Sequence, residues 1–305
     1  MHRFRHLMVG LARTKANWES DAELLRYVAM VARLGTATKV RFVHCVPGGQ
    51  GDLSTGDIEP IMADMKAQVE RSFLNVPETV EREYIVHQGP PVDHLLHEAA
   101  EHEIELLFLG HRRVHKARWA LTRRVVMKSP CSVWLVPDGS AALLQRILVP
   151  IDFSEPSADA IRVAVSLARL SGIPECTALH AYFNPAVSTY DEYDSVLLGK
   201  EQRAFEKFME KIDSQGIFVH PIFEECVDAS HSIVRAAKAQ DSDLIVMATK
   251  GRSRAAAVLL GSVTEAAILA TTTPLLAVKH FGSHMRLLEA LFDRRFRKRS
   301  DLRTD

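Results

Sequence analysis

Four short apolar runs in the first half of the chain have counterparts in the second half at a nearly constant distance. Runs of this kind are typical of strands that are buried on both faces of a parallel sheet. In a chain of 305 residues, one repeat of this length predicts two similar domains rather than a solenoid. The pairs lie 136 to 144 residues apart and are 7–11 with 147–151, 41–45 with 177–181, 106–110 with 244–248, and 130–134 with 274–278.

Segments with helical spacing lie between these runs. Residues 21–34, for example, place Leu24, Leu25, Val28 and Val31 on one helical face. Alternating strands and helices predict an α/β fold with two similar, open, mostly parallel five-stranded sheets and helices on both faces. The break in the pattern at residues 137–140 predicts domains at 1–140 and 141–281.

Composition excludes several other classes of protein. The 38 basic and 38 acidic residues balance, so no nucleic-acid partner is expected. The four cysteines form no Cys-x-x-Cys pair, which is typical of buried thiols in a reducing compartment. With no apparent signal peptide and no run long enough to span a membrane, the sequence predicts a cytoplasmic protein.

The second half contains a strand, a glycine-containing loop and a helix in succession. The apolar run 244–247 is followed by Gly251 and, after nine intervening residues, by Gly261. We expect a helix over 258–270, with Ser262 and Glu265 at the spacing of a capping box. A helix that begins next to glycine presents backbone N–H donors at the positive end of its dipole, which favours phosphate binding.

The segment 247–265 resembles the ATP-binding signature of the universal stress protein family, G-x2-G-x9-G-[S/T]. Gly251, Gly261 and Ser262 match the signature, whereas Ala248 replaces its first glycine. The repeat as a whole resembles a tandem universal stress protein over residues 5–280. The resemblance implies a Rossmann-like, adenine nucleotide alpha hydrolase-like fold, an internal pseudo-dimer of the two halves, and a stress-response regulator that binds ATP.

The resemblance also implies roles for individual residues. Asp152 matches an aspartate near the ribose hydroxyls or a nucleotide-bound Mg²⁺, although it or Ser154 can equally cap the following helix. Ala181 matches a small position against adenine. Ala248 is compatible with binding only if its φ is negative, since left-handed geometry is costly for alanine. The implied cofactor-binding residues are Pro150, Ile151, Asp152, Ala181, Met247, Ala248, Gly251, Arg252, Gly261, Ser262, Val263 and Thr264.

The first half lacks these features. Ala12 stands where the second half has Asp152, Arg113 stands where it has Gly251, and the loop is six residues shorter. The basic segment 111–118 replaces it. We therefore expect the first half to be a structural partner that does not bind ATP.

Other features favour a binding protein over an enzyme. Histidine pairs at helical spacing lack the third ligand that a zinc site needs, so no metal is expected apart from nucleotide-bound Mg²⁺. No Ser/His/Asp set or paired carboxylate site is apparent, so slow ATP hydrolysis is the most that we expect. A scaffold of the same fold that recruits a protein partner without nucleotide is the alternative.

Residues 282–305 predict a basic amphipathic helix beyond the second domain. It can dock onto the chain itself or onto a homodimer partner. An anionic membrane surface is the alternative partner for this segment.

Overall fold

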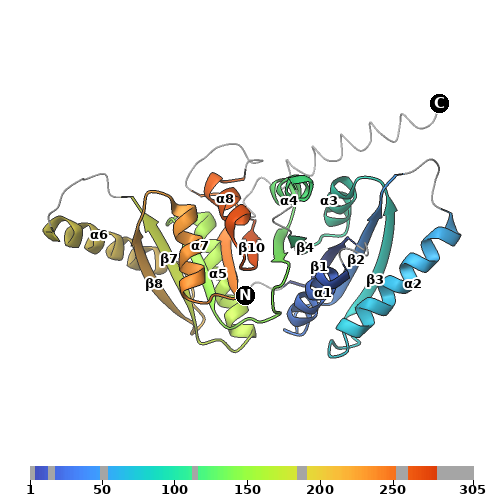
Figure 1. Cartoon of the computed structure of the whole chain (residues 1–305). Coiled ribbons are helices and arrows are strands. Elements are labelled where there is room, and N and C mark those ends of the chain that lie inside the picture. The colour runs from blue at the N-terminus through green and yellow to red at the C-terminus, as the bar shows by residue number, and fades with distance from the viewer. Residues whose placement is uncertain are drawn as a thin grey trace.

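The chain forms one ten-stranded sheet (Figure 1). The computed structural model describes residues 4–12, 18–48, 54–111, 116–183, 191–251 and 260–279. The strands are β1 (His6–Leu11), β2 (Lys39–Val46), β3 (Glu81–Gln88), β4 (Leu106–His111), β5 (Ser132–Pro137), β6 (Ile147–Ile151), β7 (Glu175–Tyr182), β8 (Phe218–Glu225), β9 (Leu244–Ala248) and β10 (Leu275–Val278). Their order is β3-β2-β1-β4-β5-β10-β9-β6-β7-β8, so each half contributes five neighbouring strands.

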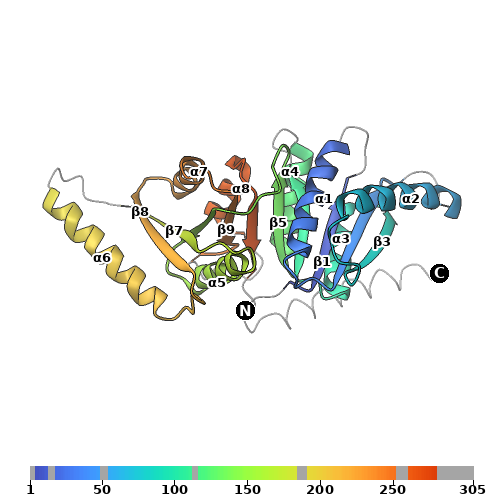
Figure 2. The ribbon, with the colours of Figure 1, turned by 90° about the horizontal axis from the view of Figure 1, so that it is seen from below.

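Helices cover both faces of this sheet and enclose two hydrophobic layers (Figure 2). The helices are α1 (Trp18–Ala32), α2 (Thr55–Ser72), α3 (Pro91–Glu101), α4 (Lys116–Lys128), α5 (Glu155–Leu170), α6 (Asp191–Met209), α7 (Ala229–Ala239) and α8 (Ser262–Ala270). One layer contains side chains of α1, α2, α5 and α6, and the other contains side chains of α3, α4, α7 and α8. The predicted α/β fold with helices on both faces is confirmed.

The central strands are apolar because both of their faces are covered. Every residue of β5, β9 and β10 is buried. The outermost strand β3 is only partly buried, and its Glu81 and Glu83 pair with Lys39 of the neighbouring strand at 3.1 and 2.9 Å. Charged side chains at an edge disfavour the addition of another strand.

The two halves join where β5 pairs with β10. All other strand pairs are parallel, whereas this pair is antiparallel, with Leu276 opposite Trp134. Both of these side chains enter one hydrophobic layer, and their neighbours Val133 and Ala277 enter the other. Trp134 is completely buried and stacks on Phe108 with ring centroids 5.4 Å apart. The predicted internal pseudo-dimer is therefore one continuous sheet whose layers cross the junction.

The helix that the sequence places at 258–270 begins later, at Ser262. Leu260 is buried but not helical, and 252–259 lie outside the described residues. The predicted C-terminal helix at 282–305 also lies outside them. Among the helices that are described, none is long and apolar enough to cross a membrane.

We expect the fragment 143–305 to dimerise or aggregate, because removal of the first half exposes the fully buried edge of β10. Sedimentation of the fragment beside the full chain measures this. A fragment that stays monomeric and folded across a range of concentrations would contradict the dependence of β10 on β5.

Candidate functional site

The predicted site residues of the second half meet at the carboxyl ends of three adjacent strands. β6 lies between β9 and β7, so the strand order reverses beside it. The chain adds β7 and β8 on one side of β6, and then adds β9 and β10 on the other side. Ligands in open parallel sheets bind at such a reversal. Asp152 follows the end of β6, while Ala248 ends β9 on one side and Ala181 lies near the end of β7 on the other. Pro150, Ile151, Met247 and Ala248 are buried, and Ala181 is half-buried.

The carboxylate of Asp152 is held in place by Ser154. The backbone N–H of Ser154 donates to Asp152 Oδ1 at 3.1 Å, and the Ser154 hydroxyl donates to the same oxygen. Phe153, between them, has a φ of 60°, a left-handed conformation that turns the chain. Ser154 also caps α5 by accepting from the backbone N–H of Ser157 at 3.4 Å. The alternative role of Asp152 as the cap of α5 is therefore wrong.

Gly251 and Asp152 approach each other closely. A Cβ atom on residue 251 would lie 2.6 Å from Asp152 Oδ2, so a side chain there would force the Asp152 carboxylate to move from its present position. Gly251 does not have a left-handed φ, so the reason for glycine here is space rather than backbone conformation. The fold thus brings together Asp152 and Gly251, two predicted site residues that lie 99 positions apart in the sequence.

Gly261 is the N-cap of α8, and no side chain caps this helix end. Its backbone N–H donates to Thr249 O at 2.9 Å, and the buried Thr264 hydroxyl donates to Ala248 O at 2.9 Å. These two bonds fix the start of α8 against the end of β9. The N–H groups of the first turn, from Ser262 to Thr264, have no acceptor within the helix.

The predicted capping box of Ser262 and Glu265 is wrong. Ser262 is the first helical residue rather than the N-cap, and the Glu265 side chain accepts from Arg123 Nε of α4 at 2.5 Å. The Glu265 carboxylate is thus engaged in an ion pair across the junction between the halves. With Gly261 as the N-cap, no side chain accepts from the N–H groups at the start of α8.

Ala248 does not have the left-handed backbone conformation that would be costly for alanine. The described residues other than glycine that have positive φ are Glu103, Phe153, Gln215 and Asp241, and Ala248 is not among them. Alanine therefore fits this position without backbone strain. Arg252, the remaining predicted site residue, lies outside the described residues.

Two lysines near the site were missed by sequence reasoning. Lys279 follows the last residue of β10, and its Nζ donates to Met127 O of α4 at 3.0 Å. Burial lowers the pKa of Lys279 to about 8 and also lowers the pKa of Lys250, which precedes Gly251. The signal in the sequence was a lysine within two residues of the end of each of two buried strands.

The first half has the same backbone arrangement at the ends of its first two strands, but it lacks the carboxylate of the candidate site. In each half a buried histidine bonds through Nδ1 to the carbonyl oxygen at the end of the first strand, His44 to Leu11 at 3.0 Å and His180 to Ile151 at 2.9 Å. Ala12, at the position of Asp152, is exposed and carries no carboxylate. Residues 112–115, including Arg113, lie outside the described residues.

Two of the histidines that the sequence analysis paired at helical spacing bond to neighbouring groups of the protein. His94 Nε2 bonds to Gln88 O at 2.9 Å, and His97 pairs with Glu101 at 2.7 Å. Within the described residues, no group of three or more histidine, cysteine, aspartate or glutamate side chains is arranged to hold a metal ion.

Comparison with known proteins agrees with this architecture. The family model described as "Universal stress protein family" matches twice, at residues 4–137 and 144–279. A curated relative, "Universal stress protein MJ0531" of Methanocaldococcus jannaschii, is 30% identical over 143 residues, which cover 45% of this chain and 83% of that protein.

Solved structures resemble nearly the whole chain. A universal stress protein from Archaeoglobus fulgidus has a TM-score of 0.63 at 16% identity and covers 91% of this chain and 98% of its own. A functionally unknown protein, PA1789 of Pseudomonas aeruginosa, has a TM-score of 0.69 at 15% identity, with coverages of 95% and 98%. At these identities the likeness shows the fold alone.

The pKa of Lys279 gives a pH-dependent prediction. Because burial disfavours the charged ammonium, Lys279 should lose its proton with a midpoint near pH 8. An NMR titration of the lysine side-chain carbons measures this, with Lys279→Gln identifying the signal. A midpoint near the ordinary lysine value of about 10.4 would show that Lys279 is solvated.

Proposed function

Because the chain belongs to the universal stress protein family, we propose that its second half binds ATP or a related adenine nucleotide and that the protein is a stress-response regulator. The approach of Gly251 to the Asp152 carboxylate carries this proposal. Gly251 has no left-handed φ, and a side chain on it would displace the Asp152 carboxylate from its present position. An anchored carboxylate beside an uncapped helix start can bind a sugar and a phosphate at adjacent points.

The phosphates would bind at the start of α8. The N–H groups of Ser262, Val263 and Thr264 are the donors there, at the positive end of the helix dipole. Gly261 allows close approach, since a side chain on it would add bulk next to Thr249 O, 3.4 Å from its Cβ position. The Lys250 ammonium, when charged, adds attraction for the same anion.

The nucleoside would bind along the ends of β6 and β7. The Asp152 carboxylate can accept hydrogen bonds from both ribose hydroxyls, or hold a Mg²⁺ that accompanies the phosphates. Ala181, Ile151 and Met247 offer small or apolar surfaces for the adenine ring. In this proposal nucleotide occupancy regulates a protein partner or a second copy of the chain.

Saturation should occur at about one nucleotide per chain, because Ala12 gives the first half no carboxylate at the position of Asp152. Isothermal titration with ATP counts the sites, and mass spectrometry of denatured protein identifies any nucleotide that copurifies. Two equivalent sites per chain would contradict the assignment to the second half.

Gly261→Val should weaken nucleotide binding by about 2 kcal/mol or more, the scale of lost charge-assisted hydrogen bonds. The free energy of unfolding should change little, because Gly261 has a φ of −63°, which valine adopts readily. Binding isotherms and melting curves of the same samples separate the two effects.

Gly110→Val is the matched control. Gly110 lies near the end of β4 in the first half, is exposed, and has no heavy atom within 4 Å of an added Cβ. We expect its nucleotide affinity to equal that of the unaltered chain. If Gly261→Val and Gly110→Val have equally small effects, the start of α8 does not bind the phosphates.

A further inference from the structure

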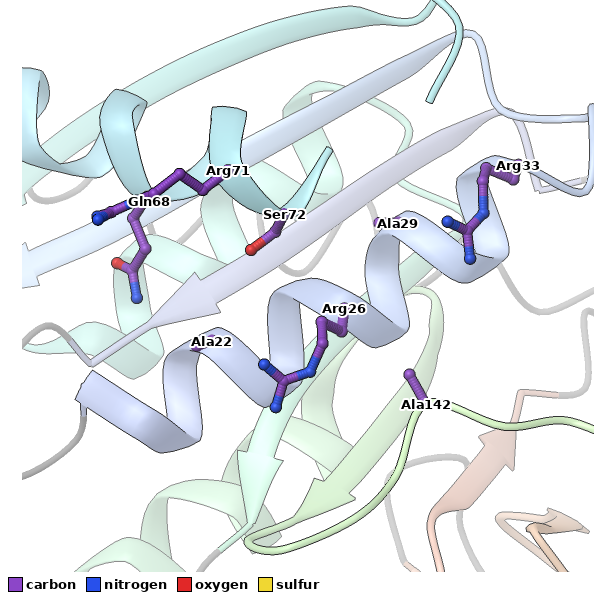
Figure 3. Close-up of a pocket in the computed structure, with 8 residues that line it drawn as sticks. All are labelled: Ala22, Arg26, Ala29, Arg33, Gln68, Arg71, Ser72 and Ala142. Atoms are coloured by element: carbon purple, nitrogen blue, oxygen red, sulfur yellow. The ribbon is translucent and has the colours of Figure 1, made fainter. Parts of the chain in front are cut away.

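A second polar cavity lies in the first half, away from the nucleotide site. It is a cleft of about 530 Å³ between α1 and α2, shown in Figure 3. Its polar side chains come from both helices: Arg26 and Arg33 from α1 and the turn after it, and Gln68, Arg71 and Ser72 from α2.

Small residues keep this cleft open. Ala22, Arg26, Ala29 and Arg33 recur at spacings of four, three and four residues, so they lie on one face of α1, with an alanine one turn before each arginine. Ala142, in the connection between β5 and β6, lines the cleft from the other side. Larger side chains at the alanine positions would fill the space.

The connection that carries Ala142 is fastened to α1. The backbone N–H of Gly139 donates to Glu23 Oε2 at 2.7 Å, and the Tyr27 hydroxyl donates to Ala141 O. Burial raises the pKa of Tyr27 to about 12, so this hydroxyl remains a donor at neutral pH. The cleft therefore has a fixed wall, and the carboxylate of Glu23 is engaged with that wall.

The charge of the cleft is one-sided. Three arginines line it and no acidic residue does. Within the part of the chain that the structure describes, the guanidinium groups of Arg26 and Arg33 form no ion pair or hydrogen bond. Arg71 is partly engaged, since its Nε donates to Ala67 O at 3.1 Å.

In the second half, the arginine that corresponds to Arg26 is neutralised by acidic side chains of its own helix. Helices α1 and α5 both lead into an Ala-Arg-Leu sequence, and seven residues before its arginine stand Arg26 and Arg162, respectively. Arg162 is paired with Glu155 at 3.1 Å and Asp159 at 2.7 Å. In α1 the counterpart of Asp159 is Glu23, which bonds to Gly139 instead, and the counterpart of Glu155 is Glu19, whose side chain is not among those that the structure describes.

We propose that this cleft binds a small, water-soluble anion that carries at least two phosphate groups. The guanidinium fork matches phosphate oxygens, and the amide of Gln68 and the hydroxyl of Ser72 supply further donors. Arg26 and Arg33 are two helical turns apart, about 10 Å along α1, so an extended anion can contact both. The volume lies in the range of small-molecule sites.

Tripolyphosphate titration of the full-length chain tests the proposal. The Gly261→Val background removes the proposed phosphate site of the second half, so binding in this background reports on the cleft. Adding Arg26→Gln and Arg33→Gln should weaken tripolyphosphate binding at least about tenfold, since two charge-assisted contacts are lost. Adding Arg162→Gln and Arg169→Gln, the counterparts in α5, should leave the affinity within about twofold.

Equal affinity in the two arginine variants would overturn the proposal. It would also be overturned if the chain bound phosphatidylcholine vesicles containing phosphatidic acid but not tripolyphosphate, because the ligand would then be a lipid surface. ATP titration of Arg26→Gln/Arg33→Gln with Gly261 intact separates the two sites. Unchanged ATP affinity supports a cleft independent of the nucleotide site, whereas parallel loss of both ligands would overturn that independence.

Discussion

The pairing of β5 with β10 is the contact on which the rest of the structure depends. It makes two five-stranded sheets into one, and both hydrophobic layers run across it without interruption. Its central residues, Trp134 and Leu276, are completely buried, so neither half can complete its core alone. The same junction brings α4 beside α8, and there Arg123 pairs with Glu265 of the first turn of α8. A contact between the halves thus reaches the helix that begins at the candidate phosphate site.

Much of the fold could be predicted from the sequence because buried parallel strands consist of short runs of apolar residues. The α/β class, the duplication and the strands around the candidate site all follow from that pattern. Helix α4 was harder to recognise, since its packing residues Val125 and Val126 stand among Arg123, Arg124 and Lys128. The capping box at the start of α8 was wrongly predicted because Ser262 and Glu265 have the spacing of a local cap, while Glu265 bonds to a residue 142 positions away. Local spacing carries no information about such a partner.

For the candidate site, the sequence identified the residue types but not the reason for them. The structure shows that a side chain at residue 251 would displace the Asp152 carboxylate, that Gly251 has no left-handed φ, and that Ser154 anchors this carboxylate. It also shows Lys250 and Lys279, whose lowered pKa values come from burial that no motif records. The cleft between α1 and α2 was invisible in the sequence, because it depends on alanines and on where Glu23 finds its partner.

Joining the halves in one chain has a consequence for the ion pair between Arg123 and Glu265. In a dimer of identical subunits every contact across the twofold axis is made twice, so a substitution alters both copies together. Counted back from the proline that precedes each last strand, the counterparts of Glu265 and Arg123 are Leu121 and Ala267, which cannot form an ion pair. The bond therefore exists once, on the side of α8. Within one chain, a substitution alters one half without altering the other, so a contact such as this ion pair can be present on one side of the junction alone.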